Sequence, residues 1–136
     1  MARAWRLYPL LALAAVAVVA CRAGDNTPQG AAEHFVDQYY VRIDLKTAAQ
    51  YCTGLALQKV QHEQQLTQGQ SVDEGTRKPS VGYKLIEKKE EDAAHAAFVF
   101  QGTINVPDAG EMTPKWLITA TKTGDDWKVS NFEEFN

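Results

Sequence analysis

Few residues of this chain could carry chemistry, and most of them stand alone. Beside the carboxylates, the candidates are two cysteines, Cys21 and Cys52, and three histidines, His34, His62 and His95. A metal site needs ligands that converge, such as histidines four residues apart on a helix, and no pair of histidines has that spacing. We therefore expect no metal and no cofactor, and a solvated surface position for each histidine.

The two cysteines have different surroundings. Cys52 lies in a segment whose apolar residues recur at helical spacing, with no histidine beside it. A catalytic thiol needs a neighbouring base or a helix amino terminus to lower its pKa, so a buried packing role is expected for Cys52. Cys21 instead ends a long apolar run, and that position carries more information.

The run from residue 7 to residue 20 has no charge and follows two arginines, Arg3 and Arg6. A charged stretch followed by an apolar one is the order of an export signal. The run contains Pro9 and is shorter than the roughly 20 apolar residues that a membrane-spanning helix needs. We expect residues 1–20 to be a cleaved signal peptide.

The end of this run, VVAC at residues 18–21, resembles the lipobox of bacterial lipoproteins. The resemblance implies a diacylglycerol on the Cys21 sulfur, cleavage before Cys21, and usually a third acyl chain on the new amino terminus. Because several acyl chains anchor a protein durably, the implied partner is a membrane of the bacterial cell envelope. Arg22 at the next position favours the periplasmic face of the outer membrane in a diderm organism. The alternative is an ordinary cysteine near a conventional cleavage site.

The charge balance excludes one class of partner. The whole chain has 14 Lys and Arg against 17 Asp and Glu, and two of the arginines belong to the leader, so 12 basic residues face 17 acidic ones after it. A net-acidic domain without a basic stripe is a poor ligand for polyanions, so we expect no nucleic-acid binding. The predicted organisation is a signal peptide at 1–20, a lipidated cysteine with its tether at 21–30, and a single domain at 31–136.

Helices are predicted in the first half of the domain. Apolar residues between positions 32 and 43 recur at three- and four-residue steps, which is the period of an amphipathic helix. Asn26 or Thr27 can cap this helix, and Pro28 fits its first turn. Asp44 offers a second cap, and Gly54 marks a break between two further helices.

The period changes to two in the second half. Alternating apolar residues predict four strands, joined by turns near position 91, at 107–114 and at 123–126. Successive hairpins make an antiparallel sheet, and its apolar face needs the helices as cover. The predicted fold class is α+β, with amino-terminal helices packed on a curved antiparallel sheet of about four strands.

This arrangement resembles the nuclear-transport-factor-like group of cystatin-like folds. The residues that carry the resemblance are AAEHFVDQYY at 31–40 and GDDWKVSNF at 124–132. The group includes ketosteroid-isomerase-like enzymes, polyketide cyclases, dehydratases and exported proteins with no demonstrated chemistry. A fold shared by so many activities does not choose among them.

Isomerase-type members of that group place a carboxylate base and a hydroxyl or acid donor in an apolar cone between sheet and helix. The alternation here presents an almost wholly apolar inner face, so we expect a non-catalytic binding or interaction module. The alternative is a small-molecule enzyme that uses the cone. The residues predicted to line a ligand pocket there are Tyr39, Tyr83, Phe100, Trp116 and Trp127.

The opposite face of the predicted sheet is mixed rather than fully polar. By alternation it presents Ala97, Val99, Leu117 and Phe132 among hydroxyl-bearing and basic side chains. Such a semi-apolar surface can bind a partner, and folds of the resembling group often dimerise through it. A homodimer through the outer sheet face is therefore a hypothesis.

Overall fold

The structure is a computed structural model and describes residues 26–68 and 79–136. The predicted signal peptide and Cys21 lie outside these residues. Helices precede strands, as the change of period predicts, and no helix in the described ranges is long and apolar enough to cross a membrane. The elements are α1 (Pro28–Val36), a π-helical turn η1 (Asp37–Val41), α2 (Leu45–Gln50), α3 (Gly54–Leu66), β1 (Ser80–Asp92), β2 (His95–Val106), β3 (Gly110–Met112), β4 (Lys115–Thr123) and β5 (Asp126–Phe135).

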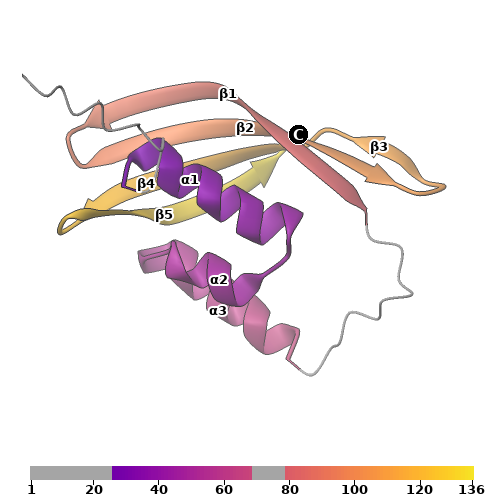
Figure 1. Ribbon diagram of the computed structural model, residues 1–136, viewed down its shortest axis with the longest axis horizontal. Coiled ribbons are helices and arrows are strands. Elements are labelled where there is room, and N and C mark those ends of the chain that lie inside the picture. The colour runs from indigo at the N-terminus through magenta and orange to yellow at the C-terminus, as the bar shows by residue number, and fades with distance from the viewer. Residues whose placement is uncertain (1–25, 69–78) are drawn as a thin grey trace, which may run out of the picture.

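The strands form one antiparallel sheet in the order β1-β2-β4-β5, and β3 pairs with the far end of β2. Figure 1 shows α1, α2 and α3 on one face of this curved sheet. The predicted α+β fold class is confirmed. The sequence predicts four strands, and the additional one, β3, lies within the segment 107–114 that its turn residues mark as a connection. It pairs through three residues only, from Gly110 opposite Val106 to Met112 opposite Ile104.

The first two helices begin at the predicted caps. The Thr27 hydroxyl oxygen accepts a hydrogen bond from the Gly30 amide at 3.0 Å, and Pro28 occupies the first turn, where no amide donor is required. Asp44 caps α2 by accepting a hydrogen bond from the Thr47 amide at 3.1 Å. The helical fold therefore starts within the residues that the sequence assigns to the tether.

The break predicted at Gly54 protects an edge of the sheet. α2 ends at Gln50, and α3 begins at Gly54, whose φ of 55° lies in the left-handed region that glycine tolerates. Between them the chain runs beside β5. The Val129 amide donates to the Tyr51 carbonyl oxygen at 2.7 Å, and the Thr53 amide donates to the Val129 carbonyl oxygen at 2.8 Å. These bonds occupy backbone groups that an open edge strand would offer to another chain.

The core lies between the helices and the inner face of the sheet, and aromatic rings dominate it. The Trp116 indole stacks on the Tyr40 ring, with 3.9 Å between ring centroids and 7° between planes. The Phe35 ring lies 4.8 Å from the Phe132 ring. The largest fully buried side chains are Trp116, Phe35, Phe98, Phe100, Ile118, Val36, Val60 and Val129.

Cys52 packs in this core, as its surroundings in the sequence predict. The residue is 6% exposed, and its thiol donates to the Ala48 carbonyl oxygen at 3.3 Å. Burial raises the pKa of the Cys52 thiol to about 12. The sulfur is therefore protonated at neutral pH and is a poor nucleophile.

A β-bulge in β1 turns two charged side chains toward the helices. Paired residues of antiparallel strands share a face, so the register gives the direction of each side chain. The register between β1 and β2 shifts after Leu85, which leaves Ile86 without a partner. Lys88 consequently pairs with Phe98 and lies, with Glu90, on the inner face.

A second bulge, in β5, corrects the prediction for Phe132. The register between β4 and β5 shifts at Thr119 and Ala120, so Phe132 pairs with Ile118 on the inner face. Strict alternation predicts Phe132 on the outer face, and this is wrong because the bulge adds one residue to the strand. The Phe132 side chain is 7% exposed and belongs to the core.

Candidate functional site

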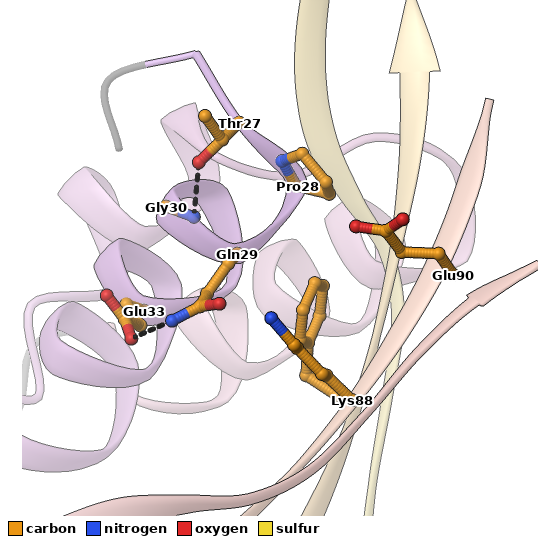
Figure 2. A pocket seen from close by; sticks show the side chains of 8 residues that line it. Thr27, Pro28, Gln29, Gly30, Glu33, Lys88 and Glu90 are labelled. Carbon is orange, nitrogen blue, oxygen red and sulfur yellow. Dashed lines mark hydrogen bonds between the residues drawn. The ribbon is translucent and has the colours of Figure 1, made fainter. Parts of the chain in front are cut away.

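A surface pocket of about 350 Å³ opens between the start of α1 and the strands β1 and β2. Figure 2 shows Lys88 and Glu90 projecting from the strand toward the helix, with Gln29 and Glu33 on the helical side. We refer to it as the α1 pocket. Its lining residues are Thr27, Pro28, Gln29, Gly30, Glu33, Lys88, Glu90 and Phe98.

Regular elements hold the polar groups of the α1 pocket in place. Glu33 accepts a hydrogen bond from Gln29 Nε2 at 3.0 Å, one helical turn earlier on α1. Lys88 and Glu90 stand two residues apart on β1, so their side chains leave the strand on the same face. The buried ring of Phe98 contributes an apolar surface between them and the helix.

The α1 pocket carries charges of both signs. Lys88 is its cation and Glu33 and Glu90 are its anions. The side chains of Lys88 and Glu90 make no hydrogen bond or ion pair with another residue in the described part of the chain. The Thr27 hydroxyl oxygen is already used in capping α1. The arrangement is therefore suited to recognising a polar ligand rather than to transferring a proton between a paired hydroxyl and carboxylate.

Of the five residues predicted to line a ligand pocket, Tyr83, Phe100 and Trp116 are neighbours on the sheet, but none of the five lines the α1 pocket. Phe100 and Trp116 are buried in the core. Tyr83 lies at the open side of the sheet and packs edge-on against Phe100, with 5.9 Å between ring centroids. The rings of Tyr83, Phe100 and Trp116, which the sequence predicts to line a ligand pocket, therefore pack within the core or against it.

Trp127 lies where the described chain enters the fold. Its amide donates to Asn26 Oδ1 at 3.3 Å, and Asn26 Nδ2 donates to the Asp125 carbonyl oxygen at 2.8 Å. The two bonds fix the start of the domain to the turn between β4 and β5. The Trp127 amide in these bonds is backbone, and the Trp127 side chain is partly buried and packs against the core.

Tyr39 and Tyr40 meet carboxylates at one end of the aromatic cluster. The Tyr39 hydroxyl donates to the Glu63 carboxylate on α3, and burial together with this hydrogen bond raises the pKa of Tyr39. Burial and the nearby charge of Glu134 raise the pKa of Tyr40. The Tyr40 hydroxyl nevertheless has no hydrogen-bond partner of good geometry among the described residues.

Rings fill the middle of the cone where isomerase-like members of the resembling group hold their substrates. Besides the stack of Tyr40 on Trp116, the Tyr39 ring lies 5.2 Å from Phe35 and 4.9 Å from Phe132. These are ordinary packing distances between aromatic centroids. The α1 pocket lies outside this packed region, at the end of the sheet beside the start of α1.

Sequence reasoning missed Lys88, Glu90, Tyr40 and Glu63 as site residues. Lys88 and Glu90 belong to the charged run at 87–92, which by composition only solubilises a hairpin end. One signal was available. The two adjacent apolar residues Leu85 and Ile86 interrupt the alternation of the strand, and such an interruption is typical of a bulge.

Two histidines of the described chain have local partners, and the third, His62 on α3, is exposed. The His34 ring stacks on Tyr51 at 5.2 Å between centroids, and His95 Nδ1 lies 2.9 Å from an Asp92 carboxylate oxygen at the turn between β1 and β2. Within residues 26–68 and 79–136, no group of three His, Cys, Asp or Glu side chains could hold a metal ion.

The sequence matches no protein-family model and no curated protein. Solved structures do resemble the fold. A protein from Thiobacillus denitrificans, assigned as a calcium/calmodulin-dependent protein kinase type II association domain, matches with a TM-score of 0.59 and 12% identity, over 80% of this chain and 94% of its own. A cystatin-like domain of unknown function from Nostoc punctiforme matches with a TM-score of 0.57 and 10% identity, over 76% and 71%. An NTF2-like protein of unknown function from Shewanella oneidensis matches with a TM-score of 0.53 and 12% identity, over 78% and 93%.

These likenesses define a class of fold and nothing finer. The chain has a cystatin-like, NTF2-like α+β fold, in which helices cover one face of a curved and unclosed antiparallel sheet. Because the identities are 10–12%, activities and partners do not transfer from those proteins to this one.

Proposed function

We propose that this chain is a lipid-anchored protein of the bacterial cell envelope whose exported domain is a non-catalytic binding or interaction module. The anchor is a diacylglycerol joined to the Cys21 sulfur as a thioether. Two arginines, an uncharged run and the VVAC sequence at 18–21 support it. The observation that favours a non-catalytic module over an enzyme is that aromatic rings fill the cone, above all the stack of Tyr40 on Trp116.

The α1 pocket is the place where the module binds its ligand. Its apolar surface at Phe98 is bordered by the Lys88 ammonium and by the carboxylates of Glu33 and Glu90. A ligand that carries both an acidic group and an ammonium group complements this lining, because each charge then meets its opposite. The ligand itself is not identified by the pocket.

The position of the α1 pocket favours a ligand at the membrane surface. Asn26 is fixed to the turn between β4 and β5, and Thr27, the next residue, already lines the pocket. Asn26 lies five positions after Cys21, and five Cα-to-Cα steps span at most about 18 Å when fully extended. A lipid on Cys21 therefore holds the pocket close to the bilayer.

Replacing the lipid-bearing cysteine is the direct test. In the native host, Cys21→Ser is expected to abolish incorporation of labelled palmitate and to release the protein from the membrane pellet. A serine oxygen does not form the stable thioether, and without the acyl chains nothing proposed here holds the domain on the bilayer. Labelling and membrane fractionation measure both effects.

Cys52→Ala is the matched control, because Cys52 is the buried cysteine of the described domain. This variant is expected to keep both the label and the membrane location. Label or sedimentation that persists in Cys21→Ser contradicts the anchor. Mass spectrometry of the wild-type chain that finds position 21 unmodified contradicts it as well.

An enzyme is the second candidate function, and one contact favours it. The hydroxyl of Tyr39 and the carboxylate of Glu63 converge, as the donor and the base of an isomerase would. The raised pKa of Tyr39 keeps its hydroxyl protonated at neutral pH, as a donor must be. The difference from an enzyme site is that the Tyr39 hydroxyl and the Glu63 carboxylate are hydrogen-bonded to each other beside packed aromatic rings.

Isomerisation of 3-cyclohexenone to its conjugated isomer, followed by ultraviolet absorbance, separates the two candidates. The binding module predicts no rate above that of buffer. A rate that is abolished in both Tyr39→Phe and Glu63→Gln would favour the enzyme, because each variant removes one of the two paired groups with little change in shape.

The outer face of the sheet is proposed as the contact of a homodimer. No described helix covers this face (Figure 1), and it exposes Ala97, Val99 and Leu117 in part, although not Phe132. Ile86, 42% exposed at the bulge of β1, adds apolar surface near it. A monomer by analytical sedimentation at high micromolar concentration would remove this hypothesis.

A further inference from the structure

We infer that a second pocket, at the opposite end of the sheet from the α1 pocket, binds a small organic cation against the Glu134 carboxylate. The pocket has a volume of about 550 Å³ and lies between β3, the start of β4 and the end of β5. We call it the β3 pocket. Its lining residues are Ile104, Met112, Thr113, Pro114, Glu134 and Asn136. The inference does not depend on the membrane anchor or on the α1 pocket.

The lining selects for positive charge. Glu134 is the one charged side chain among the six lining residues, and an ionised carboxylate only accepts hydrogen bonds. Ile104, Met112 and Pro114 supply apolar walls, and Met112 is 55% exposed, so its flexible thioether is free to close on a ligand. A cation with a hydrocarbon part satisfies both features, whereas an anion meets repulsion.

The buried hydroxyl of Tyr40 lies near the Glu134 carboxylate. Glu134 pairs with Trp116 across the strands, and the Tyr40 ring stacks on the same indole. Glu134 is near enough to raise the pKa of Tyr40, yet the Tyr40 hydroxyl has no hydrogen-bond partner of good geometry in the described chain. Buried polar groups without partners are rare and call for an explanation. An ammonium held at Glu134 would be placed to donate a hydrogen bond to the Tyr40 hydroxyl oxygen, while the hydroxyl hydrogen needs an acceptor such as the Glu134 carboxylate itself.

Two backbone irregularities bring these groups together. The bulge in β5 turns Glu134 inward, since a regular strand would place it on the outer face. The π-helical turn η1 carries Tyr39 and Tyr40, and both pack against the aromatic core. π-Helical turns are rare and frequent at functional sites. Each irregularity positions one polar partner of the proposed cation.

A charge series of one shape tests the inference. The full-length chain, labelled with ¹⁵N and with ¹³C at its methionine methyl groups, is titrated with 2-phenylethylammonium, 2-phenylethanol and 3-phenylpropanoate. We expect the ammonium to shift the signals of Met112, Thr113 and Asn136, and the alcohol and the acid to bind at least about tenfold more weakly. Equal shifts from all three probes, or none from the ammonium at about 10 mM, overturn the inference.

Glu134→Gln removes the charge with little change in shape and is expected to weaken ammonium binding at least about tenfold. Glu133→Gln is the matched control, because Glu133 precedes Glu134 on β5 and pairs with Leu117 on the outer face of the sheet, and it is expected to leave binding at the β3 pocket unchanged. Undiminished binding by Glu134→Gln contradicts the inference. Shifts confined to residues of the α1 pocket contradict it too, since they place the cation at the other site.

Tyr40→Phe separates binding from packing. Removing a buried hydroxyl that has no partner is expected to raise the melting temperature, because the folded protein no longer carries that desolvated group. The same variant is expected to bind the ammonium several-fold more weakly. Ammonium affinity equal to that of the wild type in Tyr40→Phe contradicts the proposed contact with the hydroxyl, and a rise in stability excludes misfolding as the cause of weak binding.

Discussion

Trp116→Ala is expected to lower the free energy of unfolding by about 3–5 kcal/mol, which is the cost typical of truncating a large buried aromatic side chain. The indole is 1% exposed and lies on the inner face of β4. It stacks on Tyr40 and pairs across the sheet with Phe100, so the variant leaves a void between two elements. Urea unfolding followed by far-ultraviolet circular dichroism measures the loss.

Trp127→Ala is the matched control for this prediction. It removes the same side chain from the same sheet, but Trp127 is only partly buried. Its expected loss is clearly smaller, because less apolar area leaves water on folding. Equal losses for the two variants, or a loss below about 1 kcal/mol for Trp116→Ala, contradict the assignment of Trp116 to the centre of the core.

The direction of Trp116 was predictable, because alternation holds along β4. Trp116, Ile118 and Ala120 occupy every second position of that strand, and all three are buried. Periodicity likewise predicted the order of elements, and the side chains of Thr27 and Asp44 predicted where α1 and α2 begin. These features depend on a few neighbouring residues, so a single sequence is enough to find them.

The polar residues of both pockets could not be predicted from strict alternation. Lys88 and Glu90 follow the bulge in β1, and Glu134 follows the bulge in β5, so each faces the side opposite to the one that a period of two assigns. A bulge inserts one residue and reverses every side chain after it until the strand ends. The doublet of Leu85 and Ile86 gives a local sign of the first bulge. In β5 the buried apolar residues Val129 and Phe132 are three positions apart rather than two or four, and this spacing is a sign of the second bulge.

The pair of tyrosines shows the same limitation in a helix. A period of 3.6 residues places Tyr39 on the inner face and turns Tyr40 by about 100° around the axis. The π-helical turn η1 changes the rotation per residue, and Tyr40 packs on Trp116 more closely, at 3.9 Å between centroids, than Tyr39 packs on Phe35, at 5.2 Å. The bulge in β5 and the π-helical turn η1 therefore determine where Glu134 and Tyr40 of the proposed cation site lie. Regular periodicity determines which residues form the apolar core.

Gly102→Ala is expected to destabilise the protein by about 1–3 kcal/mol, the usual cost of adding a methyl group to a packed core. A Cβ built at Gly102 would lie 2.5 Å from Cη2 and 2.6 Å from Cζ2 of the Trp116 indole. The indole has little room to withdraw, because the Tyr40 ring stacks against it. The direction of this effect is informative, since alanine in place of glycine within a strand ordinarily stabilises.

Gly82→Ala supplies the comparison, because Gly82 is also a strand glycine and a Cβ there meets nothing within 4 Å. It is expected to be neutral or slightly stabilising, as the unfolded chain loses conformational freedom without any new clash. Urea unfolding of both variants gives the difference in stability, and near-ultraviolet circular dichroism of the tryptophans reports on movement of the indole. A Gly102→Ala protein as stable as Gly82→Ala would mean that the Trp116 ring is free to shift, and the aromatic filling that separates a binding module from a cone enzyme would then lose its main support.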